Sequence, residues 1–77
     1  MPKGKTNAVD PLMLELDEDA YHYLEVQKPA RLDAVRENVR QGKSASVIGR
    51  NVLRYGGTDR MSAICERAAR HIQRTEA

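Results

Sequence analysis

The chain has 77 residues and a mass of 8.7 kDa, with 40% hydrophobic and 31% charged residues and a formal net charge of +2. This length provides material for one hydrophobic core, so the composition describes a single small domain. No apolar run approaches the roughly 20 residues that a membrane span requires. No apolar stretch of about 7–15 residues follows the basic N-terminus, so we expect no signal peptide. These absences lead us to expect a cytoplasmic protein that has no membrane partner.

The cysteine count and the aromatic content restrict the kind of core that the chain can build. Cys65 is the single cysteine, which excludes an internal disulfide and leaves a structural zinc site without its ligands. The chain contains no Phe and no Trp, so Leu, Ile, Val, Met and Ala must fill the core, a composition that favours helices. A core of this size supplies about 3–5 kcal/mol of net stability, and we therefore expect a homodimer.

The N-terminal region divides into a polar arm and a short apolar segment. Residues 1–11 combine Pro, Gly, Lys and Asn with few apolar side chains, which predicts a flexible arm. In residues 12–16, Leu alternates with Met and Glu, a period of two that indicates a short strand or an extended lead-in. Residues 12–77 together form one predicted helical domain.

Two helices are predicted in the first half of this domain. Asp17 is the predicted N-cap of the first helix, which ends near Lys28 because the residue before a proline disfavours the α conformation. Pro29 fits the first turn of a second helix, and Gly42 ends that helix in the left-handed conformation. The predicted buried positions are Ala20, Leu24 and either Tyr23 or Gln27 in the first helix, and Leu32, Val35 and Val39 in the second.

Two further helices complete the predicted fold. Ser44 or Ser46 caps the third helix, and Gly56-Gly57 closes it. Thr58 caps the fourth helix, which ends near Arg74. The predicted buried positions are Ala45, Ile48, Val52 and Tyr55 in the third helix, and Met61, Ile64, Cys65, Ala68 and Ile72 in the fourth. The sequence therefore predicts an all-α fold, a small bundle of four short amphipathic helices.

The charges are distributed unevenly along the chain. Residues 10–27 hold six carboxylates and no Lys or Arg, whereas residues 28–77 hold eleven basic side chains and five acidic ones. On the predicted helices, basic side chains recur at helical spacing: Arg36, Arg40, Lys43, Arg50, Arg54, Arg60 and Arg67. Arginine on a helix face binds phosphate bidentately and releases counterions. This pattern favours a small regulatory protein that binds nucleic acid, DNA rather than RNA, through an arginine-rich helical face.

The same arginines also have a structural interpretation. Acidic partners stand three or four residues before them on the same helix: Asp33 for Arg36, Glu37 for Arg40, and Glu66 for Arg70. Arginines that are paired in this way belong to solvated helix faces, and their charge is neutralised within the helix.

Neither the helix-turn-helix nor the ribbon-helix-helix motif fits the chain cleanly. Residues 31–55 have the outline of a helix-turn-helix, but Asn38 and Gln41 stand where a small and an apolar side chain are needed. In a ribbon-helix-helix arrangement, Met13 and Glu15 would point from the strand into the major groove, where a carboxylate is repelled by phosphate. A generic helical hairpin is the simpler interpretation of this region.

The acidic segment supports a second interpretation of the protein. An acidic surface with an exposed Tyr21 or Tyr23 suits a basic groove on another protein, and a role of this kind needs no catalytic residues. The candidate protein-binding residues are Glu15, Glu18, Asp19, Tyr21 and Tyr23. The chain would then be a non-enzymatic inhibitor, adaptor or antitoxin-like module.

The residues that could take part in catalysis, metal binding or phosphate binding lack the partners that these functions need. His22 has no second His or Cys at ligand spacing, so we interpret it as a surface histidine. Cys65 has no neighbouring base and is expected to be buried and inert. Gly56-Gly57-Thr58 lacks the preceding strand and the Lys-Ser/Thr pair of a phosphate-binding loop. We therefore expect no enzymatic activity, no cofactor and no metal site.

Overall fold

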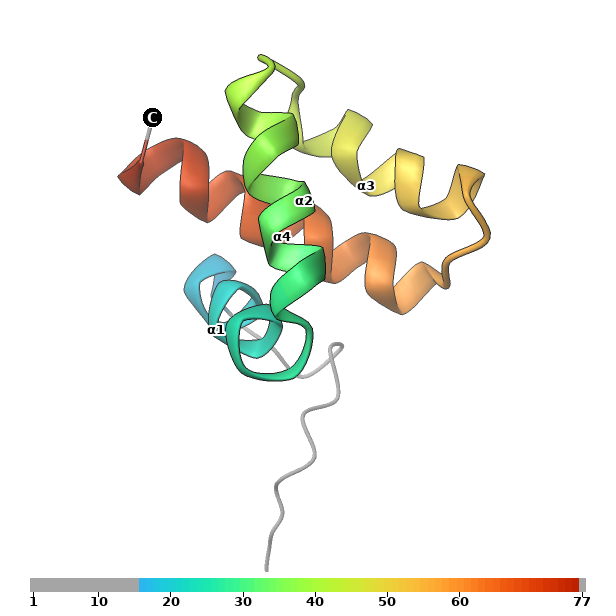
Figure 1. The fold of residues 1–77 in the computed structure, drawn as a ribbon, viewed down its shortest axis with the longest axis horizontal. Coiled ribbons are helices and arrows are strands. Elements are labelled where there is room, and N and C mark those ends of the chain that lie inside the picture. Colours follow the sequence, from blue (N-terminus) through green and yellow to red (C-terminus); the bar gives the residue numbers. More distant parts are fainter. Residues whose placement is uncertain (1–15, 77) are drawn as a thin grey trace, which may run out of the picture.

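The computed structural model describes residues 16–76, which fold into four helices joined by short turns. They are α1 (Asp17–Gln27), α2 (Pro29–Arg40), α3 (Ala45–Arg54) and α4 (Asp59–Thr75) (Figure 1). This part of the chain contains no strand, and the predicted all-α fold of four short helices is confirmed. The arm predicted over residues 1–11 lies outside the described residues, as does the extended segment predicted over residues 12–16 apart from Leu16.

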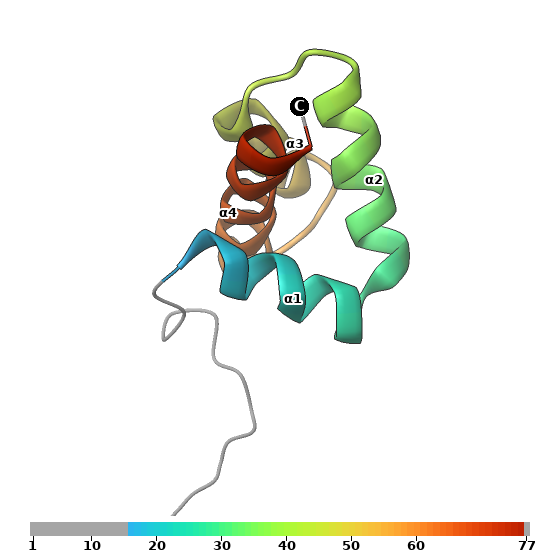
Figure 2. The same cartoon turned by 90° about the vertical axis from the view of Figure 1, so that its left-hand side faces the viewer.

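Helix α4 is the longest of the four and forms the centre of the fold. It packs against each of the other helices, most extensively against α3 and α1. Helices α1 and α3 lie on opposite sides of α4 in both views (Figures 1 and 2). The contact between α2 and α3 is less extensive than the contacts of either helix with α4. A groove is left on the surface between α2 and α3.

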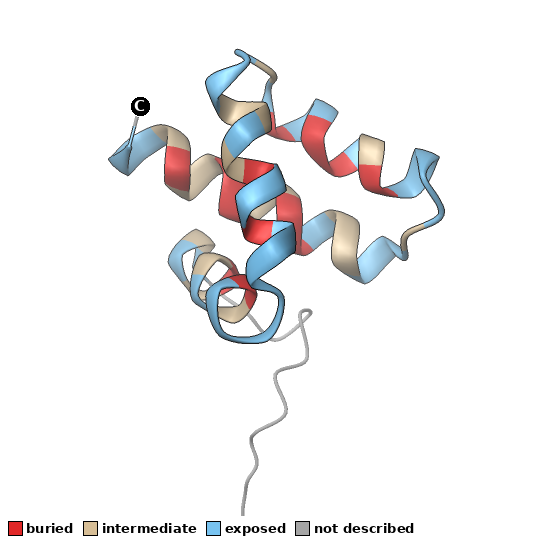
Figure 3. Ribbon diagram, viewed as in Figure 1, coloured by how far each residue is buried: buried red, intermediate tan, exposed pale blue. Residues whose placement is uncertain are grey.

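Apolar side chains from all four helices form one core around α4 (Figure 3). The largest of the completely buried side chains include Leu24 of α1 and Ile64 of α4. The buried core residues are Ala20, Leu24, Leu32, Val35, Ala45, Ile48, Val52, Ile64, Cys65, Ala68, Ala69 and Ile72. The apolar periodicity of the sequence predicted all of these positions except Ala69.

A few predicted core positions are wrong. Tyr55 is 83% exposed, because it follows the last turn of α3 beside the groove, where α2 does not cover it. Gln27 is also exposed, and its alternative Tyr23 is half-buried. Val39 and Met61 are half-buried and pack against the edge of the core.

Local features of the chain account for where α3 and α4 begin and where α2 ends. The hydroxyls of Ser44 and Thr58 each accept from the backbone N–H three residues later, at 3.3 and 3.1 Å. Both predicted caps are confirmed, with Ser44 rather than Ser46 as the N-cap of α3. Gly42 has a φ of 86°, which confirms that α2 ends in the left-handed conformation that glycine adopts without strain.

The predicted N-cap of α1 is wrong by one residue. Leu16 is the N-cap, and its backbone N–H donates to Oδ2 of Asp19 at 3.2 Å. Asp17 is the first helical residue, and its Oδ2 accepts from Arg74 at 2.8 Å and from Arg70 at 3.4 Å. These ion pairs with α4 hold the carboxylate of Asp17 away from the end of α1.

A second polar cluster joins α1, α2 and the C-terminal end of α4. Arg36 donates from Nε to Oε1 of Glu76 at 2.9 Å and from Nη2 to the hydroxyl of Tyr21 at 2.8 Å. The Tyr21 ring also lies 4.8 Å from the imidazole of His71, measured between ring centroids. This cluster brings together residues that are up to 55 positions apart in the sequence.

Acid is expected to weaken this cluster and also the ion pairs that Asp17 forms with Arg70 and Arg74, because Glu76 and Asp17 bind their arginines as carboxylates. The hydrogen bond from Arg36 lowers the pKa of Glu76. Burial raises the pKa of Asp17, but the hydrogen bonds and charges of Arg74 and Arg70 outweigh burial and lower the pKa overall. A carboxyl group with a lowered folded-state pKa contributes its full stabilisation above the unfolded pKa and loses it as the pH falls through the folded value.

We therefore expect Glu76→Gln to reduce the free energy of unfolding by about 0.5–1 kcal/mol at neutral pH, the upper part of the range for partly exposed ion pairs. At acidic pH, as the pH falls through the lowered pKa of Glu76, the difference between the two proteins should shrink, because the carboxyl group of the parent protein then becomes protonated. Thermal unfolding followed by circular dichroism at both pH values measures this difference. An equal loss at both values would show that the Arg36–Glu76 charge pair does not stabilise the fold.

Candidate nucleic-acid interface

The structure places the predicted basic residues of α2 and the following turn in different environments. Arg36 is committed to Glu76 and Tyr21 inside the junction of α1, α2 and α4. Arg40 is exposed, with Nη1 3.7 Å from a carboxylate oxygen of the same helix. Lys43 lies at the α2/α3 groove, where its Nζ donates to Oδ1 of Asn38 at 3.0 Å. These three side chains do not form one continuous basic face.

The predicted intrahelix ion pairs are present on α2 and α4. Their N–O distances are 3.7 Å for Arg36–Asp33, 3.7 Å for Arg40–Glu37 and 2.9 Å for Arg70–Glu66. Part of the positive charge on these two helices is therefore neutralised locally.

Helix α3 differs from the other helices in its charge. No Asp or Glu occurs in residues 38–58, which comprise the end of α2, the following turn and all of α3. Arg50 and Arg54 are exposed on α3, and neither forms an ion pair or hydrogen bond within residues 16–76. The other two predicted arginines belong to α4, where Arg60 is exposed and Arg67 is half-buried. Helix α3 thus presents positive charge that no carboxylate of its own opposes.

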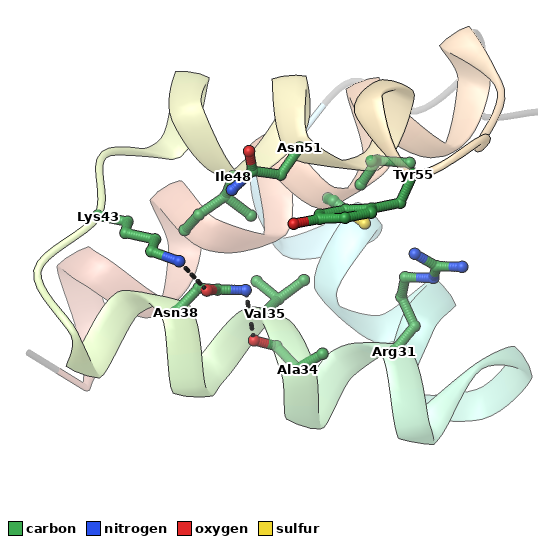
Figure 4. Close-up of a pocket in the computed structure, with 10 residues that line it drawn as sticks. Arg31, Ala34, Val35, Asn38, Lys43, Ile48, Asn51 and Tyr55 are labelled. Atoms are coloured by element: carbon green, nitrogen blue, oxygen red, sulfur yellow. Dashed lines mark hydrogen bonds between the residues drawn. The ribbon is translucent and has the colours of Figure 1, made fainter.

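The α2/α3 groove, with a volume of about 340 Å³, lies beside this basic helix (Figure 4). Its apolar lining comes from Val35 of α2, Ile48 and Val52 of α3, and Cys65 of α4. These four side chains are core residues, so the groove is a place where the core reaches the surface. The groove combines an apolar floor of packed core side chains with access from solvent.

Polar side chains line the rest of the groove, and none of them is acidic. Lys43 and Arg31 occupy opposite ends, with Asn38, Asn51 and Tyr55 between them (Figure 4). Asn38 is held in place, because its Nδ2 donates to a backbone carbonyl of α2 at 3.0 Å and its Oδ1 accepts from Lys43. Asn51 makes no hydrogen bond from its side chain to another described residue. The groove therefore offers two cations, one available amide and one phenol.

The acidic residues of the chain are concentrated on α1. This helix contains four carboxylates and no Lys or Arg. Glu18 and Glu25 are exposed and lie 3.4 and 3.2 Å from the two ring nitrogens of His22. The hydrogen bond to Glu25 is the largest effect on His22 and raises its pKa, and Glu18 acts in the same direction. His22 is exposed, as predicted for a surface histidine.

Several residues of the predicted protein-binding surface are less available than expected. One of the two tyrosines, Tyr21 or Tyr23, was expected to be exposed, but both are half-buried and pack against the core. They flank the buried positions Ala20 and Leu24 on the helix, so each lies at the edge of the α1–α4 contact. Asp19 caps α1 through its carboxylate. The predicted residue Glu15 lies outside the described residues.

Cys65 is buried in the core and also lines the groove. Burial raises the pKa of the thiol to about 11, so the group is protonated at neutral pH and is a poor nucleophile. Among residues 16–76, no group of three or more His, Cys, Asp or Glu side chains is arranged to hold a metal ion. The same residues contain no helix that is long and apolar enough to cross a membrane.

Arg31, Asn51 and Tyr55 were not identified as site residues from the sequence. Arg31 does not lie at helical spacing from the predicted basic residues Arg36 and Arg40 of the same helix, and Tyr55 fits the apolar period of α3. One sequence signal points to this region: the absence of Asp and Glu over residues 38–58, in a chain with eleven carboxylates. A search for acid-free stretches would have selected the turn and α3.

This region therefore consists of a positively charged helix beside a groove that has an apolar floor and a positively charged rim. No protein family, curated protein or solved structure matches the chain.

Proposed function

We propose that the protein binds nucleic acid and that Arg50 and Arg54 of α3 contact the phosphates. The observation that carries the proposal is the charge of α3: both guanidinium groups are exposed, neither forms an ion pair within residues 16–76, and no acidic residue occurs from position 38 to position 58. Exposed arginines hold phosphate oxygens bidentately, and each neutralised phosphate releases counterions. Lys43 and Arg31 extend the positive surface along the neighbouring groove.

The acidic helix does not oppose this mode of binding. Helices α1 and α3 lie on opposite sides of α4 (Figures 1 and 2). A helix with its side chains is about 10–12 Å across, and the Debye length at physiological salt is about 8 Å. The repulsion between the α1 carboxylates and a phosphate backbone on α3 is therefore largely screened. The negative charge of α1 also orients the molecule, since only one side attracts a polyanion.

A salt titration tests the proposal. Fluorescence anisotropy of a labelled random-sequence duplex should show binding that weakens linearly in a plot of log affinity against log salt. The double variant Arg50→Gln plus Arg54→Gln should reduce the magnitude of this slope by about 1.8, which corresponds to a loss of affinity on the order of 50-fold at 0.1 M salt. Both side chains are exposed, so the variant should remain folded.

A second double variant, Lys28→Gln plus Arg40→Gln, serves as the matched control. It removes the same charge from two exposed positions that do not line the α2/α3 groove or belong to α3. We expect a smaller loss of affinity than for the α3 variant. Equal losses would mean that binding follows net charge and not the α3 surface. Absence of binding to the duplex and to single strands, even at low salt, would reject the proposal.

The proposal includes a cytoplasmic regulatory role with DNA as the nucleic acid, and a homodimer as the binding form. Two copies would double the number of phosphate contacts and compensate for the small core of one chain. Light scattering of the free protein measures the mass, which should be twice 8.7 kDa. A monomer would contradict the dimer without affecting the role of α3.

A second candidate function is the binding of a basic protein surface. It is favoured by the four carboxylates of α1, of which Glu18 and Glu25 are exposed. Complementary charge steers such an association and makes it sensitive to salt. A labelled lysine-rich peptide should then bind, and Glu18→Gln plus Glu25→Gln should abolish its binding while duplex binding remains. Peptide binding that is unchanged in this variant would exclude α1 as the contact surface.

A further inference from the structure

The α2/α3 groove carries an inference that rests on the proposed function and goes beyond it. Its described lining combines an apolar floor, an aromatic ring, the Asn51 amide and two cations, and none of these lining residues is acidic (Figure 4). We infer that the groove receives an unstacked base of a single-stranded nucleic acid, with Tyr55 as the stacking surface. The ligand class of the protein would then be single strands, or loops and ends of folded strands, in preference to a regular duplex.

The size and lining of the groove fit one base. Its volume of about 340 Å³ lies near the lower end of the range of about 300–1,000 Å³ found for small-ligand pockets. The floor of the groove is formed by packed core side chains, among them Val35, Ile48 and Val52. A flat aromatic ring system covers such an apolar surface and removes it from water. The groove is preformed, so binding does not require α2 and α3 to separate.

Tyr55 is placed to stack on that base. Its side chain is 83% exposed, yet its ring lines the groove between α2 and α3 (Figure 4). Within residues 16–76 the ring has no aromatic partner, whereas Tyr21 lies against both histidines. Every base has a π-face, so stacking on tyrosine is tolerant of sequence. In a regular duplex the bases already stack on each other, and a base must leave the stack to reach Tyr55.

The polar groups around Tyr55 match the remaining parts of a nucleotide. The amide of Asn51 offers both a donor and an acceptor, as the edges of bases require, and it makes no hydrogen bond to another residue of the range 16–76. Asn38 is committed to holding Lys43, whose Nζ keeps two further N–H donors for a phosphate. Arg31 lies at the other end of the groove. The two cations therefore lie on either side of the proposed base site, where each is placed to attract a phosphate.

The charge of the rim also suits an acidic peptide, but the other groups favour a base. An amphipathic helix docks through a row of apolar side chains along a long groove. Here the apolar floor of the groove is short, and an amide and a phenol interrupt it. We therefore take the nucleic acid as the occupant and use an acidic peptide as a competing outcome of the test.

The experiment compares labelled oligothymidine and oligouridine of about 15 nucleotides with a duplex of the same length by anisotropy at fixed salt. Tyr55→Ala should weaken binding of the single strands by about 5- to 150-fold, the effect of losing one stacked base. Binding of the duplex should change less than about twofold. Tyr55→Phe keeps the ring and should keep the affinity. Leu53→Ala is the matched control, because Leu53 is an exposed apolar residue of α3 that does not line the groove.

The outcomes separate this inference from the proposed function. If Tyr55→Ala leaves the affinity for single strands unchanged while the α3 arginine variant weakens binding, the groove does not hold a base and the proposed function stands. If Tyr55→Ala weakens duplex and single strand equally, the preference for single strands is wrong. If no nucleic acid binds, and an acidic amphipathic peptide binds the parent protein but not Tyr55→Ala, both are rejected and the groove is a peptide site. A loss specific to single strands supports the inference, and the comparison of the two strands distinguishes DNA from RNA.

Discussion

Leu24→Ala is expected to leave a large fraction of the protein unfolded at room temperature. The Leu24 side chain is completely buried where α1 packs against α4. Its truncation removes apolar contact area and leaves a cavity, which costs about 2–5 kcal/mol. A core of this size rarely supplies more than about 3–5 kcal/mol of net stability, so the loss is comparable to the whole. Urea unfolding followed by circular dichroism measures the loss as a lower midpoint or as unfolded protein without denaturant.

Val26→Ala is the matched control on the same helix. Val26 is 72% exposed, and alanine is the better helix former at such a position. We expect the free energy of unfolding to change by less than about 0.5 kcal/mol. If Leu24→Ala and Val26→Ala had the same small effect, α1 would not be docked on α4. That result would also remove the physical separation of the acidic and basic surfaces, which depends on the position of α1.

Gly49→Val is expected to disrupt the packing of α3 on α4. A Cβ atom at position 49 would lie 3.0 Å from the backbone oxygen of Ser62 and 3.1 Å from Cβ of Glu66. The Ser62 hydroxyl also donates to the Gly49 carbonyl at 2.8 Å, which holds the two helices close at this point. Valine adds three carbon atoms to this contact, and a backbone atom cannot rotate away. We expect a loss near the upper end of the range of about 1–3 kcal/mol for overpacked sites.

Two related variants check the origin of that loss. Gly49→Ala should cost less, because the gain in helix propensity of about 1 kcal/mol partly offsets the crowding. Ser46→Val introduces the same side chain at an exposed position of α3 and should change stability by less than about 0.5 kcal/mol. Urea unfolding of the three variants gives the order. A stable Gly49→Val protein would mean that α3 does not approach α4 as closely as the Gly49–Ser62 contact requires.

The sequence by itself determined the secondary structure, because the signals involved are local. Pro29 opens α2, Gly42 ends it, and the hydroxyls of Ser44 and Thr58 cap the next two helices. Each of these effects acts within three or four residues of the helix end. The apolar period of 3.6 residues likewise identified nearly all core positions, since one stripe of each helix must be buried. The pairing of charges within helices was predictable for the same reason.

Tertiary contacts decided the points at which local reasoning failed. Asp17 is not the N-cap of α1, because Arg70 and Arg74, more than 50 residues later, bind its carboxylate. Arg36 is an internal ion-pair partner, because the fold brings Glu76 to within 2.9 Å of it. Tyr55 has the spacing of a core residue but is exposed. Its burial depends on whether α2 covers it, and a sequence period contains no information about a neighbouring helix.

The candidate site also follows from tertiary structure. The sequence identified an acidic segment and a basic remainder, but only the packing of α1 and α3 on opposite sides of α4 separates the two charges in space. The groove exists because α2 and α3 diverge, which brings Arg31 and Tyr55 to one opening although 24 positions separate them in the sequence. Helix–helix angles depend on side chains from both partners at their crossing. Local pattern therefore specifies the helices, and their mutual packing specifies which side chains share a site.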